Sequence, residues 1–181
     1  MIEPSVDAVF NRYDRKLGAA LRAHVNARPS VARALAGAAQ TMSPAYRVLV
    51  AIMIVWRPTR MRGVRALIAA VIAALLAKRL RDGIARPRPG DRTDGAMPSR
   101  HAAAAVAIAS VLADRRRGVG PPLAIVTALG LVGRISTGDH DPADLVAGAL
   151  IGRGVAGLVV RVGAPHAPRR RRRARGSTRP A

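Results

Sequence analysis

The chain has 181 residues, half of them hydrophobic, and a formal net charge of +21. Phe, Tyr and Trp together make up only 2%; a water-soluble core normally uses more aromatics, whereas alanine-rich apolar runs with glycine are typical of closely packed membrane helices. No cysteine is present, which excludes disulfides and thiolate metal sites. The basic residues lie at the ends of apolar runs without interleaved aromatics, so we expect anionic lipid rather than nucleic acid as their partner.

The N-terminal quarter of the chain predicts helices that lie on a surface. Apolar residues at helical spacing over 5–25 indicate an amphipathic helix, on the membrane surface or on the bundle. Residues 31–42 form a second, alanine-rich amphipathic piece. Ser43-Pro44 then has the pattern of an N-cap followed by proline at the first helical position. The apolar run after it, 45–56, is short for a bilayer, which needs about 20 residues.

Four further apolar runs complete the predicted fold, which is an all-α integral membrane bundle of about five membrane helices plus the N-terminal amphipathic helix. We divide the chain into interfacial helices at 1–42, a membrane core at 43–163, and a disordered polybasic tail at 164–181. The further runs cover 64–77, 101–113, 121–132 and 145–162.

The distribution of arginine predicts an orientation in the membrane. The loops at 57–63 and 114–118 and the C-terminal tail fall on one side of the membrane and are strongly basic. By the positive-inside rule this side is cytoplasmic and meets anionic lipid. The two other polar loops, 78–100 and 133–144, then share the extracytoplasmic face of a multi-pass protein.

These two extracytoplasmic loops carry the residues suited to chemistry. Ser99 precedes an alanine-rich helix as an N-cap, and His101 lies in the first turn of that helix. Asp141-Pro142 repeats the N-cap-proline pattern, which places His140 just outside the helix and Asp144 in its first turn, close enough for a carboxylate–imidazole hydrogen bond. The same loops supply guanidinium groups suited to phosphate oxygens: Arg81, Arg86, Arg88, Arg100 and Arg134.

Such a set of groups predicts phosphoryl transfer to a histidine. A carboxylate bonded to one ring nitrogen leaves the other nitrogen free to attack. Arginines can stabilise the charge on the transferred phosphoryl group, and the second histidine can protonate the leaving oxygen. We therefore expect neither a metal ion nor another cofactor.

The motifs RPRP, PSRH and R-x5-H-x3-D, in this order, resemble the three-part signature of the type 2 phosphatidic acid phosphatase family, whose usual forms are K-x6-RP, PSGH and SR-x5-H-x3-D. The resemblance spans about 78–144. It implies that His140 is the nucleophile, Asp144 its orienting partner and His101 the general acid and later base. It also implies that Arg88, Ser99 and Arg134 bind phosphate. To these we add Arg81 and Arg100, which stand at two positions that depart from the family pattern.

Three positions depart from the family pattern. The lysine position of the first motif falls on Arg81 or Arg79, depending on which Arg-Pro pair is counted, and Lys78 is a third possibility. Arg100 replaces the glycine of the second motif, and Gly133 replaces the serine of the third.

The resemblance implies a lipid phosphate phosphatase acting on a polyprenyl phosphate, a polyprenyl diphosphate or a phosphatidic-acid-like lipid. The competing interpretation is a catalytically impaired membrane protein that binds anionic lipid phosphates, which the changes at Arg100 and Gly133 favour. A nucleic-acid binder acting through the tail is a third class.

Overall fold

The computed structural model describes residues 6–84, 86, 95–113 and 119–163, and within these ranges every regular element is a helix. The predicted all-α class is thereby confirmed. Arg88, the 114–118 loop and the tail from 164 lie outside the described residues. The elements are α1 (Val6–Asn26), α2 (Pro29–Val55), the short 3-10 helix η1 (Arg57–Thr59), α3 (Arg60–Ile84), α4 (Arg100–Leu112), α5 (Gly120–Ser136) and α6 (Pro142–Val162).

The bundle is held together by small residues that let helix backbones approach closely. A β-carbon added at Gly148 would lie 2.4 Å from the Ser99 carbonyl oxygen, and one added at Gly152 would lie 2.3 Å from the Ala103 carbonyl oxygen. Alanine side chains of α3 and α4 fill the neighbouring layer, where Ala73 and Ala107 are fully buried. The spacing of α4 and α6 is therefore fixed by glycine and alanine.

α2 differs from the prediction. The expected N-cap at Ser43-Pro44 is wrong, because α2 is one helix from Pro29 to Val55 with Pro44 inside it. The reason is tertiary packing: Leu35 and Met42, before the proline, and Tyr46, after it, are all buried. The contacts of this face outweigh the local preference of proline for a helix start. The boundary at 42/43 thus falls within a helix, and the division into three segments stays a prediction.

The outer surface of the bundle carries many large hydrophobic side chains. Large hydrophobic side chains are exposed along α3, α5 and α6, as at Leu75, Ile125 and Leu150. Two helices, α2 and α6, are long and apolar enough to cross a membrane by length and composition, whereas α4 and α5 are apolar but shorter. A surface of this kind is unusual for a soluble protein and fits the predicted membrane bundle.

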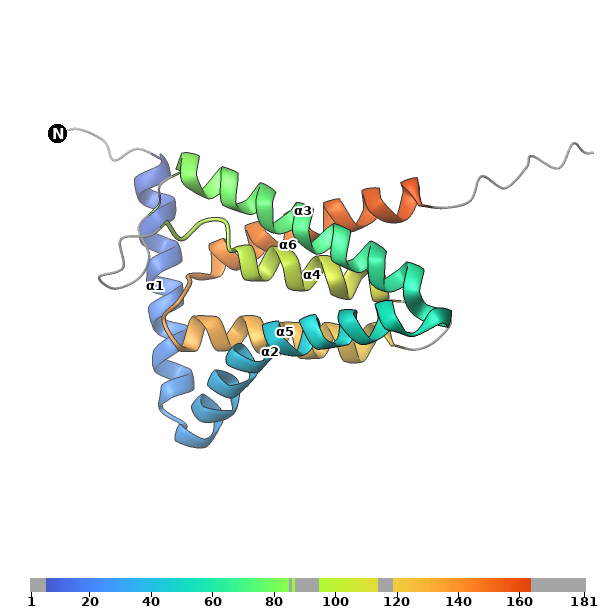
Figure 1. The fold of residues 1–181 in the computed structure, drawn as a ribbon. Coiled ribbons are helices and arrows are strands. Elements are labelled where there is room, and N and C mark those ends of the chain that lie inside the picture. Colours follow the sequence, from blue (N-terminus) through green and yellow to red (C-terminus); the bar gives the residue numbers. More distant parts are fainter. Residues whose placement is uncertain (1–5, 85, 87–94, 114–118, 164–181) are drawn as a thin grey trace, which may run out of the picture.

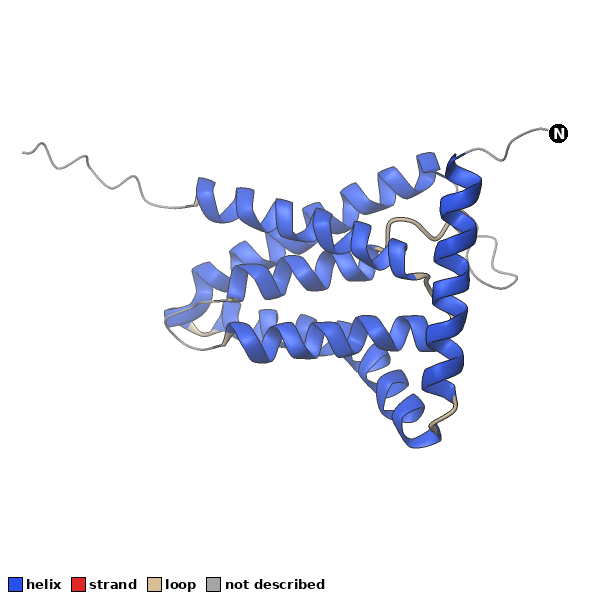
Figure 2. Ribbon diagram, turned by 180° about the vertical axis from the view of Figure 1, so that it is seen from behind, coloured by secondary structure: helices blue, strands red, loops and turns tan. Residues whose placement is uncertain are grey.

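α1 lies across one end of the bundle instead of joining it. Figures 1 and 2 show α1 running transverse to α3, α4, α5 and α6, at the end where α4 and α6 begin. Its inward contacts reach the start of α6, as at Ala143, whose N–H donates to Asp14 Oδ1 (3.0 Å). The amphipathic helix expected over 5–25 is confirmed, and it packs on the bundle.

Candidate active site

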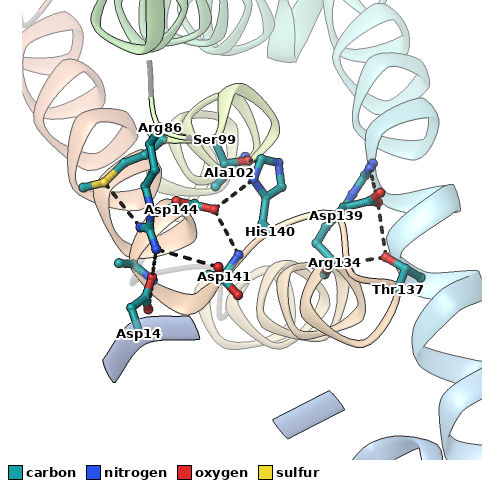
Figure 3. Close-up of polar contacts among 12 residues, drawn as sticks. Asp14, Arg86, Ser99, Ala102, Arg134, Thr137, Asp139, His140, Asp141 and Asp144 are labelled. Atoms are coloured by element: carbon teal, nitrogen blue, oxygen red, sulfur yellow. Dashed lines mark hydrogen bonds and ion pairs between the residues drawn. The ribbon is translucent and has the colours of Figure 1, made fainter. Parts of the chain in front are cut away.

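The candidate site is built around His140, which is 2% exposed and lies in the turn between α5 and α6. Its Nε2 atom lies 3.1 Å from Ser99 Oγ, and its Nδ1 atom lies 3.5 Å from Asp144 Oδ2. Ser99 caps α4, because its hydroxyl accepts the Ala102 N–H (3.4 Å). Asp144 lies in the first turn of α6, where its Oδ2 accepts the Asp141 N–H (3.0 Å). The histidine is thus held between the N-termini of two helices (Figure 3).

The predicted pairing of His140 with Asp144 is found, but as a looser contact than expected. Nδ1 of His140 makes no hydrogen bond within the described structure, and 3.5 Å is longer than a normal hydrogen bond. Asp144 therefore faces the ring nitrogen with which the sequence paired it, at a distance longer than a hydrogen bond.

Arg86 contacts Asp144 on the side away from His140, whereas the sequence suggested it only as one of several arginines suited to phosphate. It is 5% exposed, and its guanidinium lies 3.1 Å from Asp144 Oδ1, 2.5 Å from Asp14 Oδ2 and 3.7 Å from Asp141 Oδ2. A buried guanidinium needs such partners, because an unpaired buried charge is strongly destabilising. Arg86 thus binds the oxygen of Asp144 that does not face His140.

α1 completes this cluster from outside the motif region. Besides its bond to Arg86, Asp14 accepts the backbone N–H of Ala143 (3.0 Å), and Arg22 binds Asp141 Oδ1 (3.3 Å). Gly18 lies between them, and a β-carbon added there would sit 2.4 Å from Asp141 Oδ1. One face of α1 therefore packs directly against the turn that carries His140.

The cluster contains three carboxylates and two guanidinium groups: Asp14, Asp141, Asp144, Arg22 and Arg86. Burial raises the pKa of the Asp141 carboxyl, and this effect exceeds the opposing effect of Arg22; the nearby carboxylates of Asp14 and Asp144 raise it further. The burial of Asp141 thus has an electrostatic cost, which α1 reduces by supplying Arg22.

Arg134 lies on the other side of His140 from Arg86 in Figure 3. Its guanidinium pairs with Asp139 Oδ2 (3.2 Å) and donates to the Ala39 carbonyl oxygen (3.2 Å). Asp139 immediately precedes His140, so the pair places a guanidinium beside the turn. A phosphate bound here would meet Arg134 already paired with a carboxylate.

Arg100 and His101 open onto a different feature, a cavity of about 620 Å³ between α2, α3 and α4. Apolar side chains line most of this cavity, and Arg47 is its other charged lining residue. Arg81 lies near the end of α3, 3.6 Å from Asp82. The structure therefore brings together Ser99, His140 and Asp144, with Arg134 on the flank, Arg100 and His101 at the cavity, and Arg81 in a local ion pair.

The serine-to-glycine departure at position 133 has a packing reason. A β-carbon at Gly133 would lie 2.1 Å from the Leu35 carbonyl oxygen and 2.9 Å from the Ala39 β-carbon. α2 approaches α5 so closely at this point that only glycine fits. The change therefore reflects helix packing and does not by itself indicate a lost activity.

Sequence reasoning missed Asp14, Arg22 and the role of Arg86. Asp14 and Arg22 are separated from Arg86 and Asp141 by 72 and 119 residues, and no local motif links them. One signal was present: Asp14, Gly18 and Arg22 recur at i, i+4 and i+8, which places one acid, one small residue and one base on a single helix face.

Comparisons with known proteins address the fold and the family of the chain. A search of curated proteins found no significant match. Among solved structures, the chain is similar to a transmembrane PAP2 type phosphatidylglycerolphosphate phosphatase from Bacillus subtilis (20% identity, TM-score 0.69, covering 85% of this chain and 86% of that one). It is also similar to LpxE from Aquifex aeolicus (23% identity, TM-score 0.67, covering 78% and 92%). Both likenesses support the fold. A family model described as the PAP2 superfamily matches residues 39–166, which is most of the chain, and the protein therefore belongs to the PAP2 superfamily.

Proposed function

We propose that the chain is a metal-independent lipid phosphate phosphatase that hydrolyses a polyprenyl (di)phosphate or a phosphatidic-acid-like lipid through a phosphohistidine at His140. Membership of the PAP2 superfamily gives the coarse class, a phosphoric ester hydrolase associated with membranes. The observation that carries the finer proposal is the setting of His140, whose two ring nitrogens face Ser99 and Asp144 in a buried turn.

The contacts of His140 support a different role for each of its two ring nitrogens. Asp144 faces Nδ1 of His140 and favours the tautomer with hydrogen on that atom, which leaves the Nε2 lone pair on the side of Ser99 as the nucleophile. Attack by Nε2 forms the N–P bond as the bond from phosphorus to the leaving oxygen breaks, and His101 donates a proton to that oxygen. Water deprotonated by His101 then attacks phosphorus, which releases inorganic phosphate and restores neutral His140.

Phosphate binding in this scheme uses Ser99, the N-terminus of α4 and arginines. Free N–H groups at a helix start attract anions, and Ser99 marks that start for α4. Arg134 would exchange its carboxylate partner, Asp139, for phosphate oxygens. Arg81 and Arg88 are further candidates for this role, and Arg88 lies outside the described residues.

We assign the mostly apolar cavity between α2, α3 and α4 to the lipid chain of the substrate. Its lining combines Arg100 and His101 at the start of α4 with apolar residues deeper along α4, as far as Ile108. Seven residues of helix correspond to roughly 10 Å. A lipid that enters sideways from the bilayer could therefore place an apolar chain in the cavity and its phosphate near His101.

We also propose the orientation and the surroundings of the site. Under the positive-inside rule, the basic loops and the tail lie on the cytoplasmic side of a multi-pass protein, where they meet anionic lipid. The turn that carries His140 then opens on the extracytoplasmic side. Reactivity of single cysteines with a membrane-impermeant reagent, at Thr137 and at Arg57, tests this orientation in a chain that has no native cysteine.

Phosphate release from a panel of lipid phosphates in detergent with EDTA tests the activity. Wild type should release phosphate, His140→Ala should release none, and His24→Ala, which changes an exposed histidine bonded to Arg28, should behave as wild type. Loss of activity in EDTA would overturn the metal-independent mechanism, and activity in His140→Ala would overturn the assignment of the nucleophile.

One observation favours the alternative function of a lipid-phosphate binder without catalysis. Arg134 is occupied by Asp139 in the structure, and a carboxylate in that position competes with substrate phosphate. Binding of lipid phosphates without release of phosphate, by a folded wild-type protein and across the whole panel, would support this alternative.

A further inference from the structure

α1 presents chemically different faces, and two of them face different surroundings. The inward face carries Asp14, Gly18 and Arg22, of which Asp14 and Gly18 are buried. A second face carries large apolar side chains that remain exposed, at 51% for Phe10, 68% for Tyr13, 53% for Leu17 and 39% for Leu21. This arrangement is the reverse of a helix in a soluble protein, which buries its apolar side.

We propose that α1 is an interfacial clamp, which binds the lipid surface through its apolar face and positions the His140–Asp144 pair through its polar face. The proposal goes beyond the family signature, because α1 lies wholly outside the residues that match the superfamily, 39–166. It rests on the proposed function for the identity of the reaction that the clamp supports.

The lipid surface is the occupant that the structure favours for the apolar face. α1 runs transverse to the bundle helices, at the end where the candidate site lies (Figures 1 and 2), and a helix in this position lies flat at the level of the lipid headgroups. Arg12, Arg15 and Lys16, exposed on the same helix, provide positive charge for anionic lipid. The exposed apolar residues of the bundle, such as Leu80 and Val146, continue this lipid-facing surface.

The polar face acts through two buried links. Asp14 binds Arg86, which binds the far oxygen of Asp144, the partner of His140 Nδ1. Arg22 binds Asp141, the residue next to His140. Asp14 also accepts the Ala143 N–H in the first turn of α6. A shift of α1 would therefore move both the carboxylate and the backbone that orient the imidazole.

Asp14 and Arg22 are positioning residues under this proposal, because neither touches the reacting atoms. Misplacement of a reacting group by about 1 Å can cost roughly 10²-fold in rate. We expect Asp14→Asn to lower kcat by ten- to a hundred-fold with KM nearly unchanged, on lipid and on short-chain soluble phosphates alike. His24→Gln, at an exposed polar residue of the same helix, is the control and should retain the wild-type kcat.

The apolar face predicts a different defect. Leu17→Ser combined with Leu21→Ser should lower phosphate release from substrate in vesicles of phosphatidylcholine and phosphatidylglycerol. The same variant should keep wild-type kcat on a soluble short-chain phosphate in detergent. A loss on both substrates in equal measure, or on neither, would overturn the lipid-facing role of α1.

A direct measurement of lipid contact completes the test independently of catalysis. A fluorophore attached to Leu17→Cys should be quenched by lipids that carry a quencher near the headgroup, and the same fluorophore at Ala128→Cys, midway along α5, should be quenched less. Equal or weaker quenching at position 17 would overturn the clamp. If wild type releases no phosphate, the proposed function fails, while quenching still decides whether α1 lies on the lipid surface.

Discussion

The serine that the family motif carries at position 133 provides a direct test of how α2 packs on α5. A side chain at Gly133 would strike the Leu35 carbonyl oxygen, 2.1 Å from the new β-carbon. This obstacle is helix backbone, so α2 can relieve the clash only by moving as a whole. Arg134 would move too, because it donates to the Ala39 carbonyl oxygen on the same helix.

The expected magnitude follows from this geometry. Overpacking a well-packed site costs about 1–3 kcal/mol, and a backbone obstacle places Gly133→Ser and Gly133→Ala at the upper end of that range. Because 1 kcal/mol corresponds to roughly 2–4 °C for a chain of this size, we expect Tm to fall by about 6–12 °C. Phosphate release should fall as well, since Arg134 is displaced.

Thermal unfolding in detergent, followed by circular dichroism, measures this effect against a matched glycine. Gly154 also lies within a helix, and nothing lies within 4 Å of a β-carbon added there. Gly154→Ala should keep or slightly raise Tm, because alanine favours helix by about 1 kcal/mol over glycine. If Gly133→Ser proved as stable as Gly154→Ala, α2 would not approach α5 as described, and the packing explanation of the missing serine would be wrong.

Three further predictions concern the site. Ser99→Ala should abolish most phosphate release, because it removes a hydroxyl that the proposal assigns to phosphate binding beside His140 Nε2. Loss of the α4 cap costs about 1 kcal/mol, so unfolding and kinetics are measured together to separate the two effects. Wild-type phosphate release by Ser99→Ala would refute this role. Arg86→Gln should destabilise the fold by about 3–5 kcal/mol, because it leaves buried carboxylates unpaired. Arg79→Gln, at an exposed arginine, is its control in the same unfolding assay. Equal stabilities of the two variants would contradict the burial of Arg86 among these carboxylates. Burial raises the pKa of Asp141 above its usual 3.8, so its contribution to stability is fully present below pH 3.8 and is lost as pH rises through the raised pKa. Asp141→Asn should therefore gain in Tm relative to wild type as pH rises from 4 to 7, and a relative loss over this range would reverse the sign of the argument.

The sequence predicted those parts of the protein whose signals are local. Apolar runs and caps located four helices, and the Asp141-Pro142 start of α6 was correct because proline and an N-cap act on the first turn alone. At Pro44 the same pattern misled, since α2 continues past the proline and has buried residues on both sides of it. A local signal marks a helix start only where no packing contact opposes it.

The same distinction between local signals and packing contacts applies to the candidate site. Ser99, His140 and Asp144 could be found from motif spacing, because each sits at or near the start of a helix whose first turn fixes its direction. The partner of Asp144 could not, since the choice of Arg86 among several arginines of that segment depends on where α1 places Asp14. The spacing of the motifs predicts which residues form the candidate site, whereas the packing of buried segments decides which residues position them.

The charges around His140 show why the outer arginines matter to the chemistry. Its turn contains Asp139, Asp141 and Asp144, three carboxylates that would repel a phosphate dianion. Each is paired with an arginine from a different segment: Arg134 of α5, Arg22 of α1 and Arg86 after α3. These pairs offset the charge of the turn, with Arg86 shared between Asp144 and Asp14, and they also tie the turn to three separate parts of the fold. When Arg134 exchanges Asp139 for a substrate phosphate, the pairs of Arg22 with Asp141 and of Arg86 with Asp144 still balance charge in the turn. This makes the transverse helix α1 as necessary to the proposed reaction as the motif residues themselves.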